Sequence, residues 1–157
     1  MMTFRIRGLD PTQFSSFFSM DESGLAASRA TRVTAGQGRY PCRVSLEDAM
    51  QGEELMLIHH TNHDVETPYR NAFAIFVRKY ASEAADYVDS VPPILRGRPI
   101  ALRCYNDGGN LVTAGLSLKD DVDVILRSLL EREDVAYIDA HNAMHGCFAA
   151  RAERHGS

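Results

Sequence analysis

The stretch HNAMHGCFAAR, residues 141 to 151, brings a thiol and two imidazoles together near the end of the chain. An imidazolium beside a cysteine favours the nucleophilic thiolate, which is the basis of Cys-His catalysis. If two paired strands flank the loop in this stretch, His141 and Cys147 face each other with their Cβ atoms about 5 Å apart. This interpretation makes Cys147 the nucleophile and His141 the base of an enzyme, with Asn142 or Asp139 orienting the imidazole ring.

The same cysteine also has a structural interpretation. Cysteine is among the residue types most often buried, where it behaves as a small hydrophobic side chain. The segment GCFAA has the small and aromatic residues that are typical of a packed strand. We therefore favour a packing role for Cys147 and keep the enzyme as the alternative function.

Arginine is a second source of chemistry, because 15 of the 17 basic residues are arginine and only Lys79 and Lys119 are lysine. The planar guanidinium group binds carboxylates and phosphates through two parallel hydrogen bonds. The candidate ligand-binding residues are Arg43, Tyr69, Arg70 and Arg151. Together with His141 they predict a protein that binds a small anionic ligand. Surface ion pairs and a compositional bias of the source genome are the alternative explanations.

The nitrogen and sulfur side chains that zinc accepts occur in two segments, at His59, His60, His63, His141, His145 and Cys147. Their spacing does not match a metal motif, because the sequence has no C-x-x-C pair and no H-E-x-x-H. His59 and His60 are adjacent and would point to opposite faces of a strand, and His63 is expected in a loop. We assign no metal site.

The three cysteines, Cys42, Cys104 and Cys147, are odd in number and widely spaced, unlike a secreted disulfide framework. Reduced thiols are therefore expected. A redox pair of Cys42 with Cys147 is a further candidate, and it requires Cα atoms within about 7 Å of each other.

No cofactor motif is recognisable, since G-x-x-x-x-G-K-[ST], G-x-G-x-x-G and G-x-S-x-G are all absent. The segment NDGGN, residues 106 to 110, could pass for a phosphate loop, but a β-hairpin turn explains it better. We expect no bound cofactor.

The formal net charge of −4 argues against attraction to nucleic acid or to an anionic membrane surface. No segment approaches the roughly 20 apolar residues of a membrane span, and the first ten residues lack the apolar run of a signal peptide. We expect a soluble cytoplasmic protein without a nucleic-acid or membrane partner. The oligomeric state stays open.

The elements that must position these residues follow from the apolar pattern. A chain of 157 residues that is 45% hydrophobic predicts a single domain over residues 1–157. Apolar segments predict strands at TFRIRG, SRATRVTA, ELMLI and NAFAIFVRKY, and hairpins around NDGGN and NAMHG. Asp10 and Pro11 predict the start of a helix with a phenylalanine face, and LEDAM and SEAADYVDSVPP predict short helices.

From Ser117 the apolar period changes to 3.6, which predicts a helix over residues 117–132 packed on one face of the sheet. Helices and strands do not alternate regularly along the chain. This order favours an α+β fold with a mostly antiparallel sheet and a few helices.

The segments YPCRVSLEDA, GEELMLI, PYRNAFAIFVR and AYIDAHNAMHGCFAAR, taken in order, make the chain similar to an uncharacterised bacterial family of domains of unknown function. The resemblance covers most of the chain from Tyr40 onward. It implies a small, single-domain bacterial protein, and it carries no assigned activity, substrate or catalytic residue.

Overall fold

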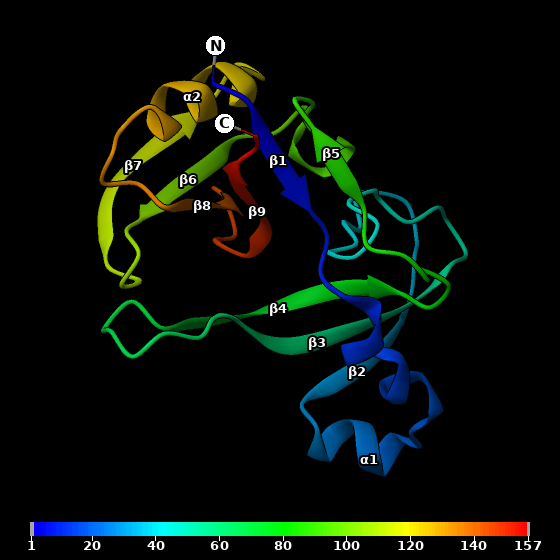
Figure 1. Cartoon of the computed structure of the whole chain (residues 1–157). Helices are drawn as coiled ribbons and strands as arrows, with labels where there is room; N and C mark the ends of the chain where they lie inside the picture. Colours follow the sequence, from blue (N-terminus) through cyan, green and yellow to red (C-terminus); the bar gives the residue numbers. More distant parts are fainter. Residues whose placement is uncertain (1, 157) are drawn as a thin grey trace.

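Two antiparallel sheets form the frame of the molecule, in a computed structural model that describes residues 2–156 (Figure 1). The larger sheet has six strands in the order β5–β1–β9–β8–β6–β7, and every neighbouring pair is antiparallel. Its strands are β1 (Phe4–Arg7), β5 (Asp86–Val88), β6 (Ile100–Tyr105), β7 (Leu111–Ser117), β8 (Tyr137–Asn142) and β9 (Phe148–Arg154). The predicted α+β fold with a mostly antiparallel sheet is confirmed.

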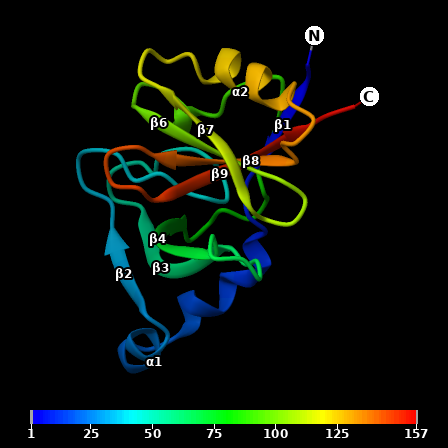
Figure 2. The ribbon, with the colours of Figure 1, turned by 90° about the vertical axis from the view of Figure 1, so that its left-hand side faces the viewer.

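The smaller sheet has the order β2–β3–β4 and lies below the larger one in Figure 2, with α1 beneath it. Its strands are β2 (Ala30–Thr34), β3 (Glu54–His63) and β4 (Asn71–Arg78), and α1 covers Glu22–Ala27. The β3–β4 hairpin reaches under the larger sheet, where the Thr67 hydroxyl donates to the Gly109 carbonyl at 2.9 Å. The two hairpin tips are thereby tied together.

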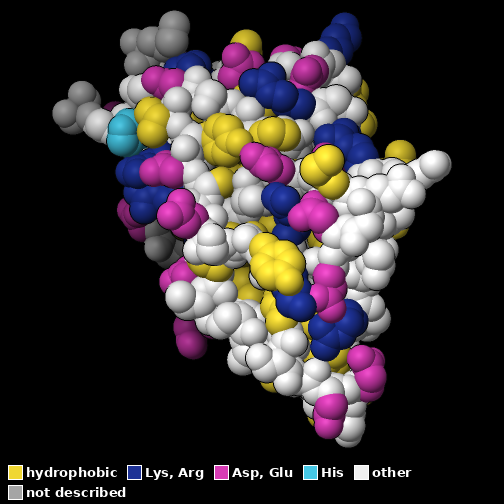
Figure 3. Space-filling model, turned by 90° about the vertical axis from the view of Figure 1, so that its right-hand side faces the viewer, with side chains coloured by type: hydrophobic (Ala, Val, Ile, Leu, Met, Phe, Trp, Pro, Cys, Tyr) yellow, Lys and Arg dark blue, Asp and Glu magenta, His cyan; other side chains and the backbone are white. Residues whose placement is uncertain are grey.

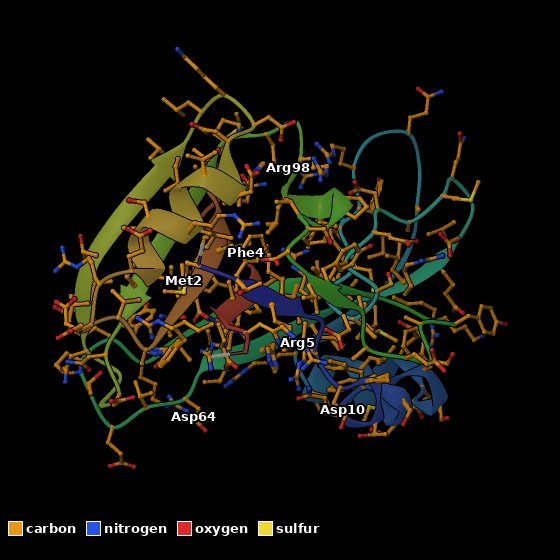
Figure 4. All side chains as sticks on the ribbon, turned by 45° about the horizontal axis from the view of Figure 1, so that its top comes forward. Met2, Phe4, Arg5, Asp10, Asp64 and Arg98 are labelled. Atoms are coloured by element: carbon orange, nitrogen blue, oxygen red, sulfur yellow. The ribbon has the colours of Figure 1, made fainter. Side chains whose placement is uncertain are left out.

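The helix α2 (Val122–Leu130) packs on the face of the larger sheet that points away from the smaller one (Figure 2). Its residues Val122, Leu126 and Leu130 are buried in one apolar cluster with the inner side chains of β1, β6 and β8. Phe4, which is labelled in Figure 4, belongs to this cluster. The Arg127 guanidinium lies 4.8 Å from the centre of its ring. The predicted packing of this helix on the sheet is confirmed.

The predicted start of this helix at residue 117 is wrong. Ser117 ends β7, and its hydroxyl binds both the main chain and the carboxylate of Asp121, at 3.2 and 2.7 Å. Asp120 adopts a left-handed φ of 58°, so residues 118 to 121 form a turn. The helix begins only after this turn, and Leu118, which the helical pattern had included, is exposed.

Three other predicted helices differ from the structure. Residues 82–91 form no helix but contain β5, which pairs with β1. The LEDAM segment is irregular, and its Asp48 forms an isolated antiparallel bridge with Pro41. The helix predicted from Asp10 is present as two short 3-10 helices, η1 (Pro11–Gln13) and η2 (Ser15–Ser19). Asp10 caps the first of them as expected, by accepting from the Thr12 N–H at 3.0 Å. A third 3-10 helix, η3, covers Pro93–Leu95.

Gly8 lies where the chain leaves β1 and passes to the smaller sheet. Its N–H donates to the Ala85 carbonyl, and the next N–H, of Leu9, donates to the Arg43 carbonyl at 2.8 Å. A Cβ atom on Gly8 would lie 1.9 Å from the Val44 carbonyl oxygen. This close approach holds the segment around Arg43 against the first strand.

Acidic and basic side chains are intermixed over the face of the molecule that Figure 3 displays. Many arginines make ion pairs of this kind, for example Arg78 with Glu53 and Arg132 with Asp134, both at 2.8 Å. Surface pairing therefore accounts for part of the arginine content.

Candidate functional site

A pocket of about 490 Å³ lies where the segment after β2, the strand β4 and the β8–β9 loop come together. We call it the arginine pocket. Three guanidinium groups, a thiol and an imidazole line it together with apolar side chains, and its residues are Arg39, Pro41, Arg43, Leu57, Ala74, Phe76, Arg98, Pro99, Asn142, Met144, His145 and Cys147.

Arg43 forms the buried part of this pocket and is only 4% exposed. Its main chain is fixed between two elements, because its N–H donates to Phe76 on β4 and its carbonyl accepts from Leu9. Its Nε donates to the Phe148 carbonyl at 2.7 Å, and Nη1 donates to the Pro41 carbonyl. The guanidinium is thus held by neutral carbonyl groups.

No carboxylate among residues 2–156 forms a salt bridge with Arg43. Burial lowers the pKa of Arg43 to about 10, whereas Cys147, Cys42 and, less strongly, Asp48 act in the opposite direction. The side chain still carries its charge at neutral pH. A buried charge without an ionic partner is costly, so the site favours the approach of an anion.

The other two arginines share one carboxylate. Arg39 donates to Asp48 through Nε and Nη2 at 3.2 and 3.1 Å, and Arg98 donates to the second Asp48 oxygen at 3.4 Å. Arg98 is labelled in Figure 4, close to the segment that carries Asp48. Burial, and then the charge of Arg39, lower the pKa of Arg98.

The pocket therefore holds more positive than negative charge. Three guanidinium groups line it, Asp48 is the carboxylate that pairs with two of them, and no acidic residue belongs to the described lining. Fork-shaped guanidinium donors in such a recess can hold a carboxylate or phosphate through charge-assisted hydrogen bonds.

Asn142, the last residue of β8, and Cys147, in the β8–β9 loop, both line the pocket. The Asn142 N–H donates to the Cys147 carbonyl at 2.9 Å, and the Gly146 N–H donates to the Asn142 carbonyl at 2.7 Å. The Asn142 side chain accepts from the Met144 N–H, and Gly146 adopts a φ of 82°, which favours glycine. This closed turn leaves the Cys147 side chain partly exposed in the pocket.

The predicted opposition of His141 and Cys147 is wrong. The turn is one residue shorter than expected, so Phe148 is the residue opposite His141. His141 is fully buried, with Nδ1 2.9 Å from the Gly146 carbonyl. That carbonyl can only accept, so Nδ1 carries the proton and Nε2 has the free lone pair.

Burial lowers the pKa of His141 to about 4, so its ring is neutral at pH 7. The buried Nε2 atom has no hydrogen-bond partner among residues 2–156. The histidine that lines the arginine pocket together with Cys147 is the exposed His145 of the β8–β9 loop.

The other predicted ligand-binding residues do not line the pocket. Arg70 makes an exposed ion pair with Asp64, whose place at the hairpin end is labelled in Figure 4. Arg151 pairs with Asp139 at 2.7 and 3.1 Å. Tyr69 contributes a main-chain carbonyl to His63. The structure thus groups Arg43, Asn142 and Cys147 and separates them from Tyr69, Arg70, Arg151 and His141.

A buried polar cluster between the two sheets was not recognised in the sequence. His63, expected in a loop, lies at the end of β3 and is 1% exposed, which corrects that expectation. Its Nδ1 lies 2.9 Å from the Tyr69 carbonyl and its Nε2 lies 2.6 Å from the Tyr137 hydroxyl. Tyr105 stacks on the His63 ring, and the carboxylate of Asp139 is fully buried.

No cluster of three or more histidine, cysteine, aspartate or glutamate side chains suited to a metal ion occurs among the described residues. Cys42 is fully buried, and its sulfur accepts from the N–H groups of Ser45 and Arg78 at 3.4 and 3.3 Å. All three cysteines are free thiols, so the proposed pair of Cys42 with Cys147 is not formed.

Two pocket residues, Arg39 and Arg98, were missed in the sequence analysis. Arg39 stands four residues before Arg43 in the segment RYPCR, so one basic cluster could have been noticed there. Arg98 lies more than fifty residues away and reaches the pocket through the bond to Asp48. The spacing of Arg98 from Arg39 and Arg43 in the sequence does not predict that they line the same pocket, because they are brought together by a contact between loops.

Comparison with known families gives one match, to a family described as protein of unknown function (DUF1203), over residues 39–154. That range contains every residue of the arginine pocket. No curated protein and no solved structure matches the chain. Within the described residues, none of the helices has the length and apolar character needed to cross a membrane.

Proposed function

The chain belongs to the DUF1203 family, whose function is unknown, and we propose that it binds a small anionic molecule in the arginine pocket. The observation that carries this proposal is the environment of Arg43. Its guanidinium is nearly buried, bound to main-chain carbonyls and unpaired with any carboxylate of the described chain. An anionic ligand supplies the missing countercharge.

The form of the pocket supports an anion with an apolar portion. Leu57, Ala74 and Phe76 line one part of it, and the guanidinium groups line another. Its volume of about 490 Å³ is within the range of small-molecule sites. The ligand class we infer is a carboxylate or phosphate carried by a short apolar or aromatic group.

Phosphate and phenyl phosphate test this proposal directly. Thermal unfolding and titration calorimetry are run at constant ionic strength, with chloride as the reference anion. A ligand at 100 times its Kd is expected to stabilise the folded protein by about 2.7 kcal/mol. Phenyl phosphate is expected to bind more tightly than phosphate, because its ring covers the apolar wall.

Arg98→Gln removes one guanidinium and is expected to weaken binding about tenfold, since a hydrogen bond to a charged group contributes about 1.5–3 kcal/mol. Arg132→Gln is the matched control, because Arg132 pairs with Asp134 away from the pocket lining and its loss should leave affinity unchanged. Absence of a saturable effect of either anion on the wild-type chain would refute the proposal.

A second candidate is an enzyme in which Cys147 is the nucleophile and His141 the base. The exposure of the Cys147 thiol in the arginine pocket favours the first half of this assignment. The second half has weaker support, because the His141 ring is buried and its register partner is Phe148. Cys147→Ser separates the two functions, since it leaves the guanidinium groups in place.

A further inference from the structure

Cys147 is the one accessible thiol among the three cysteines of the chain. Cys42 and Cys104 are both fully buried, and burial raises the pKa of Cys104 to about 11. Cys147 is partly exposed and lines the arginine pocket. A reagent in solution therefore reaches this sulfur first.

Positive charge lines the pocket that holds Cys147. Arg43 lines the same pocket, is more than nine-tenths buried and lacks an acidic partner among residues 2–156. Its Nη2 makes no hydrogen bond to any of these residues. A cationic recess of this kind raises the local concentration of anionic reagents around the thiol.

The other residues of the pocket limit the kinds of reaction that the Cys147 thiol can undergo. Acyl and phosphoryl transfer usually need a group that protonates the departing atom. The described lining contains no aspartate, glutamate or tyrosine, and its only imidazole is that of the exposed His145. Thiol–disulfide exchange needs no such acid, because the departing sulfur is stable as a thiolate.

We propose that Cys147 forms a mixed disulfide with a low-molecular-weight thiol that carries carboxylate groups. This proposal rests on the proposed anion binding, since the guanidinium groups of Arg39 and Arg98 would hold the carboxylates in the pocket that Arg43 and Cys147 also line. The pocket thus becomes a modification site for small acidic disulfides.

The exchange is balanced without any additional oxidant. The Cys147 thiolate attacks one sulfur of the small disulfide, a new S–S bond forms, and the original S–S bond breaks. The second half of the small disulfide leaves as a thiolate with the electron pair. Cys147 is oxidised and the small disulfide is reduced. A free small thiol reverses the step by attacking the mixed disulfide.

Resolution by a second cysteine of the chain is disfavoured. The Cys42 sulfur is fully buried and accepts hydrogen bonds from Ser45 and Arg78, and Cys104 lies in the apolar cluster under α2. The mixed disulfide should therefore persist until an external thiol removes it, which makes it measurable by intact mass.

The experiment compares three small disulfides of different charge on the full chain. Dithiodipropionate is dianionic, hydroxyethyl disulfide is neutral and cystamine is dicationic. Adduct formation at Cys147 is followed by mass spectrometry under pseudo-first-order conditions. The dianion is expected to react at least about tenfold faster than cystamine, because a cationic recess concentrates anions about 10-fold to 1,000-fold. The same reagents on the urea-unfolded chain correct for their intrinsic reactivities.

Variants locate the effect. Cys147→Ser should abolish the adduct, and Arg98→Gln and Arg39→Gln should each lower the dianion-to-dication rate ratio at least about threefold. Arg132→Gln should retain the wild-type ratio. These variants avoid Arg43, whose bonds to two main-chain carbonyls make folding dependent on it.

Two outcomes separate this proposal from the proposed function. If phenyl phosphate stabilises Cys147→Ser as it does the wild type, but the folded wild type shows no charge preference in adduct formation, the disulfide proposal is wrong and anion binding stands. If neither phosphate nor phenyl phosphate binds and the dianionic disulfide reacts no faster than the dicationic one, both proposals are wrong. A charge preference that Arg98→Gln reduces supports the disulfide proposal.

Discussion

His141 on β8 lies opposite Phe148 on β9, and its ring is held by the Gly146 carbonyl at 2.9 Å. Ala140 pairs with Ala150, and the next residue, His141, pairs with Phe148. Ala149 has no partner and is therefore the extra residue of a bulge. The bulge buries the imidazole in the strand pair. It also leaves Cys147 before the start of β9, in the turn that lines the pocket.

The buried His141 makes stability depend on pH. Its pKa is about 4 in the folded chain against an ordinary value of 6.5, so the unfolded chain binds the proton first. The neutral His141 ring therefore contributes about 3 kcal/mol to the free energy of unfolding above about pH 6.5, and this contribution is lost as the pH falls towards 4. Denaturant unfolding between pH 4 and 7 measures it.

His141→Gln should flatten this part of the pH profile relative to wild type, whatever its effect on stability at pH 7. His59→Gln, at an exposed position, is the control and should keep the wild-type slope. Parallel profiles of wild type and His141→Gln would show that the imidazole is not buried as described.

Asp139 and Arg151 should contribute to the free energy of unfolding mainly through their mutual ion pair. Arg151→Ala leaves a fully buried carboxylate without its partner and is expected to cost about 3 kcal/mol of the free energy of unfolding. Asp139→Asn together with Arg151→Ala should cost less than the sum of the single changes. Additive costs in a double-mutant cycle would contradict this coupling.

The Tyr137 hydroxyl should stabilise the polar cluster between the sheets. The hydroxyl lies 2.6 Å from Nε2 of His63. When Nδ1 of His63 donates to the Tyr69 carbonyl, the Tyr137 hydroxyl donates to Nε2. Tyr137→Phe leaves that buried nitrogen unsatisfied, which costs about 1–3 kcal/mol. Tyr80→Phe removes a hydroxyl from an exposed ring and should leave the unfolding midpoint in urea unchanged. Equal midpoints for the two variants would argue against the bond.

Gly8→Ala should disturb both stability and anion affinity. The new Cβ would meet the Val44 carbonyl at 1.9 Å, so the segment next to Arg43 must move. Steric strain of this kind costs about 1–3 kcal/mol. Gly36→Ala is the control, because its Cβ would meet only the Tyr40 hydroxyl at 3.5 Å. Calorimetry with phenyl phosphate should detect weaker binding for Gly8→Ala alone.

Local patterns were sufficient for much of the fold. The hairpin around residues 106–109 and the last hairpin both form, because their turn residues and apolar alternation specify neighbouring strands. The segment 82–91 was mistaken for a helix, because its pairing partner β1 lies about eighty residues earlier in the chain. Such pairing overrides local propensity.

The candidate site was foreseen in part. The sequence indicated Arg43, Asn142 and Cys147 as chemically interesting, and these side chains line one pocket. Arg39 and Arg98 were missed, and the partner proposed for Cys147 was wrong because the turn is one residue shorter than expected. Asn142 still belongs to β8, and its N–H donates to the Cys147 carbonyl. A change of one residue in the turn shifts the register and reverses the faces of a strand, and the local pattern does not indicate it.

The sequence by itself determined the α+β class, the main hairpins and an excess of guanidinium groups, because these depend on neighbouring residues and on composition. The tertiary structure decided which charges are paired. Arg70 and Arg151 each meet a carboxylate, whereas Arg43 meets main-chain carbonyls and is buried. Burial and pairing depend on contacts between distant segments, so only the folded chain separates an arginine available to a ligand from one that is neutralised within the protein.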